Sequence, residues 1–219
     1  MKKILGLGIA ALLVMMMVGG GTWAYFSDTE ESQGNAVAAG TLDLTLTGGS
    51  GSPNYSILTG LTNKAPGDSG SLYATIKNIG TLTGELDIAT GAVTNTGGAG
   101  GSQYEDGVGN LGGEAQIVIW IDADKSTSFT DNDIILPYNS STPVVRTAGS
   151  PATIDAYYAT VDSYASKSWG GTAGVKTMDQ NDEHYVYISW KVPTTAGNNI
   201  QGDSFSFTVT FTLEQPAAD

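Results

Sequence analysis

The chain has 219 residues, with 22 acidic and 9 basic side chains, a formal net charge of −13 and no cysteine. So acidic a surface repels phosphate backbones, which excludes nucleic-acid binding, and the lack of cysteine excludes disulfide bonds and thiol chemistry. The length suits a single domain with a substantial core.

The first segment, residues 1–24, has the layout of a secretory signal peptide. Two lysines are followed by the apolar run Ile4–Val18, three glycines and a small residue, Ala24. The apolar run is shorter than the roughly 20 residues that a membrane-spanning helix needs. We therefore expect a signal peptidase to cleave between Ala24 and Tyr25, and the mature protein to be secreted without a membrane segment.

Residues 25–39 form a polar stretch that precedes the first strand pattern. Only a few apolar side chains, Tyr25, Phe26, Val37 and Ala38, could anchor it to another surface. We expect an extended N-terminal arm that takes no part in the core of its own domain.

Residues 40–219 show the alternating apolar and polar pattern of β-strands. The run 117–121 is apolar throughout, which suits a strand covered on both faces. The run 205–213 alternates most clearly, with phenylalanine, valine and leucine on one face. Strands are expected at 42–46, 72–76, 82–88, 117–121, 134–136, 185–192 and 205–213. The predicted fold is all-β, a single antiparallel β-sandwich with Greek-key or jelly-roll connections and long glycine-rich loops.

One short helix is expected within residues 150–165. Pro151 suits a first helical turn, and Ile154, Tyr158 and Val161 follow helical spacing. The adjacent tyrosines and the valine suit a strand equally well.

An acidic segment, residues 122–133, follows the apolar strand. Oxygen-bearing side chains fall at positions 1, 3, 5, 9 and 12 of a calcium loop of the EF-hand type, namely Asp122, Asp124, Ser126, Thr130 and Asp133. Phe129 could anchor the loop to the core. However, Thr127 stands where such loops have glycine, and Asp133 is shorter than the usual glutamate. A calcium site and a solvated hairpin loop both remain open, and no other cofactor is expected.

The sequence offers no catalytic constellation. His184 is the only histidine, so neither a pair of zinc-binding histidines nor a His-Glu-x-x-His motif can form. A serine triad built on His184 would lack the Gly-x-Ser-x-Gly elbow. His184 is expected at the surface beside Glu183, and the chain is not expected to be an enzyme.

Three tryptophans could form a carbohydrate-stacking platform or belong to the core. Trp120 and Trp190 lie in apolar strands, whereas Trp169 does not. Core packing is therefore the expectation.

Several short segments resemble the TasA/camelysin family of biofilm-matrix fibre proteins and archaeal bundling pilins. The similarity is concentrated around the predicted cleavage site, in 19–24, 25–28 and 39–44, and recurs in 66–68, 76–80, 190–193 and 197–203. The resemblance implies a secreted subunit of an extracellular filament or pilus that is matured by a signal peptidase. It also implies head-to-tail self-assembly, in which the arm pairs with the sheet of the neighbouring subunit.

Two alternatives remain beside the filament. The chain could be a monomeric secreted or cell-surface β-domain that binds a glycan, an ion or a protein. It could also be a type IV-like pilin that retains its apolar helix, although Gly6 follows leucine rather than the basic residue that such signals use. The metallopeptidase activity attached to camelysins lacks its ligands in this sequence.

Overall fold

The computed structural model describes residues 42, 44–47, 54–55, 61–62, 64–98, 108–150, 153–170 and 175–215. All of these belong to the predicted β-domain. The predicted signal peptide, the cleavage site at Ala24 and Tyr25, and the arm with Phe26, Val37 and Ala38 lie outside the described residues.

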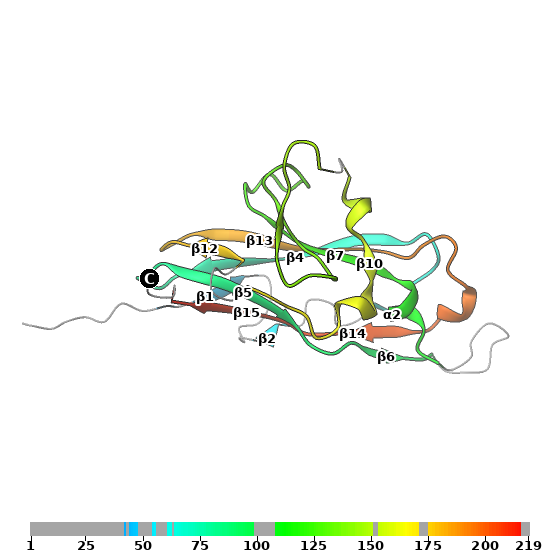
Figure 1. Ribbon diagram of the computed structural model, residues 1–219. Helices are drawn as coiled ribbons and strands as arrows, with labels where there is room; N and C mark the ends of the chain where they lie inside the picture. The colour runs from blue at the N-terminus through cyan, green and yellow to red at the C-terminus, as the bar shows by residue number, and fades with distance from the viewer. Residues whose placement is uncertain are drawn as a thin grey trace, which may run out of the picture. The chain divides into compact units, whose positions relative to one another are not determined.

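The described residues form antiparallel sheets (Figure 1). The seven-stranded sheet has the order β1 (Leu44–Thr47), β4 (Ser69–Asn78), β13 (Glu183–Lys191), β7 (Gln116–Asp122), β8 (Ile134–Leu136) and β9 (Val144–Val145), and β10 (Ala159–Thr160) also pairs with β7. The five-stranded sheet has the order β11 (Ser168–Trp169), β5 (Gly84–Thr90), β15 (Val209–Glu214) and β2 (Asn54–Tyr55), and β12 (Lys176–Met178) pairs with β5. The three-stranded sheet has the order β3 (Leu61–Thr62), β14 (Ser204–Ser206) and β6 (Thr94–Thr96).

One hydrophobic core lies between these sheets. It receives alternate residues of the long strands, for example Ile76 of β4, Ile88 of β5, Ile119 of β7 and Phe211 of β15. The all-β antiparallel sandwich is thereby confirmed, whereas the jelly-roll or Greek-key type of its connections stays a prediction.

Strand β7 is buried on both faces, as its apolar sequence predicts. Ile119 faces the main core, while Val118 and Trp120 face a second cluster on the opposite side of the sheet. Together with the antiparallel pairing of Ile121 and Ile134, this confirms the expected hairpin of β7 and β8.

The predicted strand 205–213 proves to be two strands in two sheets. The chain leaves the pairing of β14 after Ser206 and begins β15 at Val209. Between them the carbonyl of Thr208 accepts a hydrogen bond from the N–H of Gly91 (2.8 Å). Phe205 and Phe207 are buried on the predicted face. The alternation therefore predicts the buried face correctly, but it carries no sign of the change of sheet.

The predicted helix within 150–165 is wrong. Its described part consists of the 3-10 turns η1 (Ile154–Tyr157) and η2 (Val161–Tyr164), separated by β10. Ala159 is extended because it pairs with Ile117 of β7. The other helical elements among the described residues are α2 (Leu111–Glu114) and η3 (Asn198–Ile200). No helix in the described part of the chain is long and apolar enough to cross a bilayer.

Two further expectations need correction. In the predicted strand 72–76, alternation places Leu72 on the same face as the buried Ala74 and Ile76, but Leu72 is 37% exposed. His184, expected at the surface, is only 7% exposed. It lies on the inward face of β13, opposite Ile76, and neither of its ring nitrogens has a hydrogen-bond partner. The alternation of β13 places His184 on the same face as Val186, and this pattern overrides its polarity.

Burial makes His184 a source of acid sensitivity. Desolvation is the main cause that lowers the pKa of His184 below its ordinary value of 6.5, and the charge of Lys176 acts in the same direction. The unfolded chain thus binds this proton more readily than the folded one. His184 therefore leaves the free energy of unfolding unchanged above pH 6.5. As the pH falls below 6.5, it lowers the free energy of unfolding by at most about 1.4 kcal/mol per pH unit.

We predict that His184→Leu loses less stability than the natural protein between pH 7.5 and pH 5.5. The measurement is the free energy of unfolding in urea at both pH values. All carboxyl groups are common to the two proteins, so the difference between them isolates the imidazole. Equal losses in both proteins would contradict the prediction.

Candidate functional site

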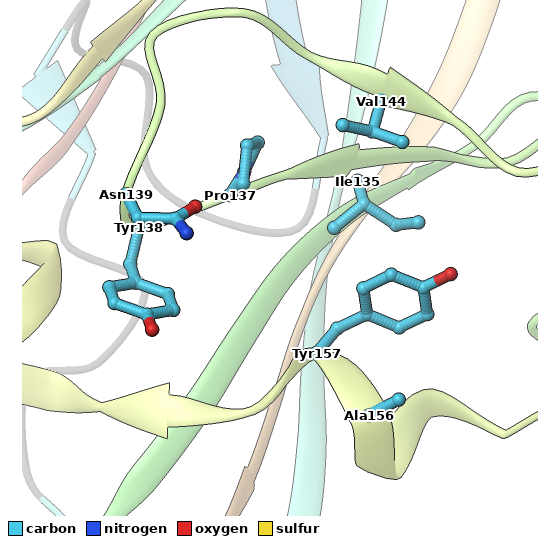
Figure 2. A pocket seen from close by; sticks show the side chains of 7 residues that line it. All are labelled: Ile135, Pro137, Tyr138, Asn139, Val144, Ala156 and Tyr157. Atoms are coloured by element: carbon cyan, nitrogen blue, oxygen red, sulfur yellow. The ribbon is translucent and has the colours of Figure 1, made fainter. Parts of the chain in front are cut away.

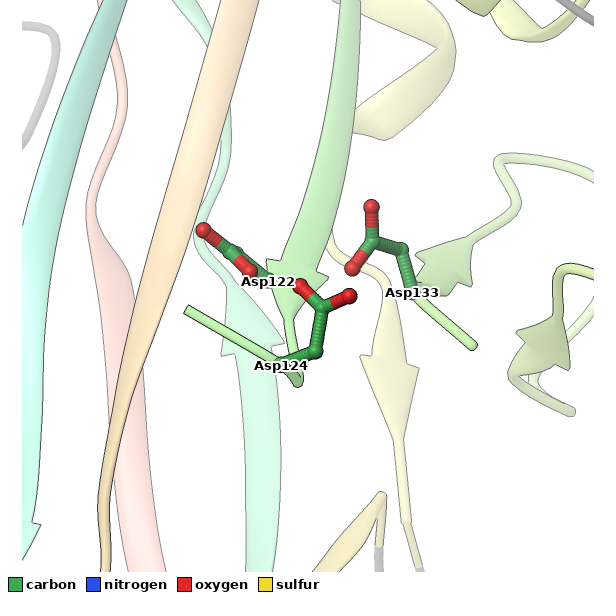
Figure 3. A group of neighbouring side chains, drawn as sticks. All are labelled: Asp122, Asp124 and Asp133. Carbon is green, nitrogen blue, oxygen red and sulfur yellow. The ribbon is translucent and has the colours of Figure 1, made fainter. Parts of the chain in front are cut away.

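The acidic loop between β7 and β8 brings three carboxylates together (Figure 3). Asp122 ends β7, Asp133 immediately precedes β8, and both are fully buried, whereas Asp124 is exposed. One oxygen from each of these carboxylates lies within 4.8 Å of the others. Because Ile121 pairs with Ile134, the hairpin itself holds Asp122 and Asp133 close together.

Backbone N–H groups of the loop point at the two buried carboxylates. Asp122 accepts hydrogen bonds from the N–H of Ser126 (3.1 Å) and of Thr127 (2.8 Å). Asp133 accepts from the N–H of Ala123 (3.2 Å) and of Thr130 (2.6 Å). The loop is therefore wound around its own acidic side chains.

The remaining predicted ligands join the same network. Thr130 Oγ1 donates to Asp124 Oδ2 (3.2 Å) and lies 3.3 Å from Ser126 Oγ. Ser126 Oγ donates to the carbonyl of Ser128 (3.0 Å), and the N–H of Ser126 donates to Asp124 Oδ1 (3.0 Å). The five side chains that the EF-hand spacing predicts as ligands thus lie together in the acidic loop.

Thr127 adopts the backbone conformation for which EF-hand loops use glycine. Its φ is +61°, and Lys125 (φ +59°) and Asn132 (φ +76°) are also left-handed. For a β-branched residue this conformation is strained by about 1–3 kcal/mol. The sharp turn is therefore made without glycine, at a cost in stability.

Phe129 anchors the loop as the sequence indicated. Its ring packs edge-on against Trp120 at 5.3 Å and against Tyr157 at 5.7 Å. The guanidinium of Arg146 lies over the ring at 5.1 Å and forms an ion pair with Asp131 (2.8 Å). These contacts fix the middle of the loop on the outer cluster of β7.

Burial and hydrogen bonding shift the pKa values of the clustered carboxylates in the loop. Burial is the main cause that raises the pKa of Asp133 to about 6, and the charges of Asp122 and Asp124 add to it. Burial also raises the pKa of Asp122. The pKa of Asp124 is lowered, because Ser126 donates hydrogen bonds to it. Hard divalent cations prefer carboxylate, hydroxyl and carbonyl oxygens as ligands. In loops of the EF-hand type the cation bound by such oxygens is calcium.

The three tryptophans of the described residues are buried, as expected. Trp120, Trp169 and Trp190 are 4%, 1% and 8% exposed. Trp169 Nε1 donates to the carbonyls of Pro137 (2.9 Å) and Ser140 (3.0 Å). A stacking platform of these three tryptophans is thereby ruled out.

Described residues line two cavities on the outer side of the seven-stranded sheet. One, of about 310 Å³, lies between β8, β9 and η1 and is lined by Ile135, Pro137, Tyr138, Asn139, Val144, Ala156 and Tyr157 (Figure 2). No carboxylate, amine or imidazole lines it. The other is lined by tyrosines of β4 and β13, a grouping that the sequence did not predict. The i, i+2 spacing of Tyr185 and Tyr187 was the available signal, but the partner Tyr73 is known only from the strand register.

Known proteins resemble this chain at two levels, that of a family and that of an individual relative. The family described as Camelysin metallo-endopeptidase matches residues 1–219. The major biofilm matrix component of Bacillus subtilis (strain 168) is 43% identical over 83 residues, which are 37% of this chain and 29% of that protein. The match thus spans less than a third of the length of that relative.

We predict that Thr127→Gly raises the free energy of unfolding by about 1 kcal/mol, because glycine removes the strain of the left-handed backbone. Urea denaturation measures the change. Thr142→Gly is the matched control, since Thr142 is exposed in a loop and is not among the residues with positive φ. Glycine should not stabilise the protein there, and equal effects at both positions would contradict the argument.

Proposed function

Since the chain belongs to the camelysin family, we propose that it is a structural subunit of an extracellular filament. The observation that carries the proposal is the 43% identity to a protein named as a major biofilm matrix component. The family description names a metallo-endopeptidase, but the sequence contains a single histidine. That histidine is buried in a strand, so the two-histidine zinc motif of such peptidases cannot be built.

Assembly begins with export in this proposal. A signal peptidase removes residues 1–24 after Ala24, which leaves Tyr25 as the first residue of a free arm. The mature subunit is then secreted without a membrane segment, and its partners are further copies of itself.

The arm pairs with a strand edge of the next subunit, as in donor-strand exchange. Strand β15 offers such an edge. Its full length pairs with β5, but on its other side β2 covers only Val209 and Thr210. Among the described residues no strand pairs with Phe211–Glu214 on that side. Strand β14 is different, because β3 and β6 pair with both of its edges.

The other receiving segment named from the sequence, Pro193–Gln201, is held to the core by Ala196 and Ile200. We therefore assign the receiving edge to Phe211–Glu214. Tyr25, Phe26, Val37 and Ala38 supply the side chains that fix the arm there. Each contact joins an arm to a different surface of the next copy, so the assembly stays open and grows as a filament.

The arm is tested with two proteins, one beginning at Tyr25 and one at Gly40. We expect the first to form filaments in electron micrographs and the second to remain monomeric, because an unpaired edge alone supplies no arm. Phe26→Asp together with Val37→Asp should also abolish filaments, whereas the matched polar change Ser27→Asp should not.

Circular dichroism establishes that each protein is folded. Filaments formed by the folded Gly40 protein as readily as by the longer one would refute donor-strand exchange. Such filaments would still be compatible with an extracellular matrix role in which the subunits assemble through other contacts. The absence of filaments from both would favour the monomeric secreted β-domain.

We also propose that the acidic loop binds calcium through Asp122, Asp124, Ser126, Thr130 and Asp133. The support is that the fold gathers these oxygen atoms in one network around buried carboxylates. Binding of a cation to the folded state alone would stabilise it by mass action.

We predict that saturating calcium raises the melting temperature by about 5 °C over the chelated protein, as expected for a ligand well above its dissociation constant. Asp124→Asn, at an exposed position, should abolish most of the gain. Glu114→Gln, an exposed carboxylate in α2, is the matched control and should retain it. Equal melting temperatures with calcium and with chelator would leave the solvated acidic loop as the correct interpretation.

A further inference from the structure

Three tyrosines gather on the outer face of the seven-stranded sheet. Tyr73 of β4 lies directly opposite Tyr187 of β13, and Thr75 lies opposite Tyr185. With Thr127 of the acidic loop these residues line a cavity of about 270 Å³, which we call the tyrosine groove. Its volume lies just below the range of about 300–1,000 Å³ that is usual for small-ligand sites, so it suits a short stretch of a chain molecule.

The rings of the groove form a rigid platform. Tyr187 is stacked on the buried Trp120, with ring centroids 4.4 Å apart and an angle of 10° between the planes. Tyr73 lies 5.4 Å from Tyr187 and 5.9 Å from Tyr185. Rings that are already packed lose little conformational entropy when a ligand covers them.

Tyr73 nevertheless remains 59% exposed, the highest value among the exposed large hydrophobic side chains of the described residues. Tyr185 and Tyr187 beside it are half-buried, and a cluster of aromatic rings that is partly open to water is a candidate surface for a ligand. Tyr73 therefore leaves part of the aromatic surface of the groove open to solvent.

The chemistry of the lining selects the ligand. Tyrosine and threonine contribute aromatic faces and hydroxyl groups, and no ionised side chain lines the groove. Lys125, close to Thr127 in sequence, has Glu183 as its partner (3.9 Å). Lys77 lies on the same face of β4, opposite Glu183, but neither lysine lines the groove, and the net charge of −13 would repel an anionic ligand.

A neutral sugar chain fits this lining. The C–H face of a pyranose ring can stack on an aromatic ring, and its hydroxyl groups can exchange hydrogen bonds with phenol and threonine hydroxyls. We propose that the tyrosine groove binds a neutral polysaccharide chain. The inference does not depend on filament formation, although a filament would repeat the groove and increase the avidity.

The groove also borders the acidic loop. The N–H of Thr127 donates to Asp122 Oδ2 (2.8 Å), and Thr127 forms part of the lining. One wall of the groove is thus held in place by the carboxylate that ends β7.

The test is native affinity electrophoresis of the secreted protein in gels that contain laminarin, hydroxyethylcellulose, dextran or galactomannan. Alginate serves as the anionic comparison. We expect at least one neutral polymer, and not alginate, to retard the protein. Tyr73→Ala should weaken that affinity about tenfold, which corresponds to the loss of one aromatic stacking contact. Tyr73→Phe should retain most of it, because the ring remains.

Tyr138→Ala is the matched control, since Tyr138 is a surface tyrosine (39% exposed) that lines the other cavity. Its retardation should equal that of the natural protein, and melting curves establish that all variants are folded. Three results would overturn the proposal: no retardation by any neutral polymer, equal retardation of Tyr73→Ala, or Tyr73-dependent binding of a polyproline peptide without any binding of polysaccharide.

Discussion

The burial of β7 on both faces is the constraint on which the rest of the structure depends. A strand whose residues alternate between two apolar clusters needs cover on each side of its sheet. Residues of the main core cover Ile119, and the rings of Phe129 and Tyr187 pack against Trp120. Because Phe129 must reach Trp120, the loop after Asp122 has to fold back over the sheet, and this return brings the acidic side chains together.

The same constraint explains why the acidic loop tolerates buried carboxylates. An ionised carboxylate removed from water is costly unless hydrogen bonds or an opposite charge offset the loss. The loop provides backbone N–H groups to Asp122 and Asp133, but the raised pKa of Asp133, about 6, shows that these bonds do not offset the whole cost. A divalent cation would supply the missing charge, and Thr127 already holds the turn that an EF-hand loop requires.

The local pattern of apolar and polar residues predicted much of this fold. The remaining features depend on which strands pair and in which register. The β7–β8 hairpin and the loop residues followed from an apolar run and from the spacing of oxygen-bearing side chains, both of which are short-range signals. The split of 205–213 into β14 and β15 and the extended backbone at Ala159 depend on which strands pair, which no local pattern contains. The same is true of the tyrosine groove, since Tyr73 meets Tyr187 only through the pairing of β4 with β13. The assignment of calcium to the loop stays a prediction.

A sandwich has two kinds of surface, and they suit different tasks. Edges present unpaired backbone groups, which any extended segment can complete, so they favour assembly with little dependence on side chains. Faces present side chains, which select by shape and charge. Among the described residues Phe211–Glu214 of β15 has a strand on one side only and is thus an edge, whereas Tyr73 and Tyr187 lie on a face of the other large sheet. Assembly through the edge and recognition through the face would therefore use separate sheets. A subunit built this way could bind a matrix polymer while it is part of a filament, with no catalytic group required for either task.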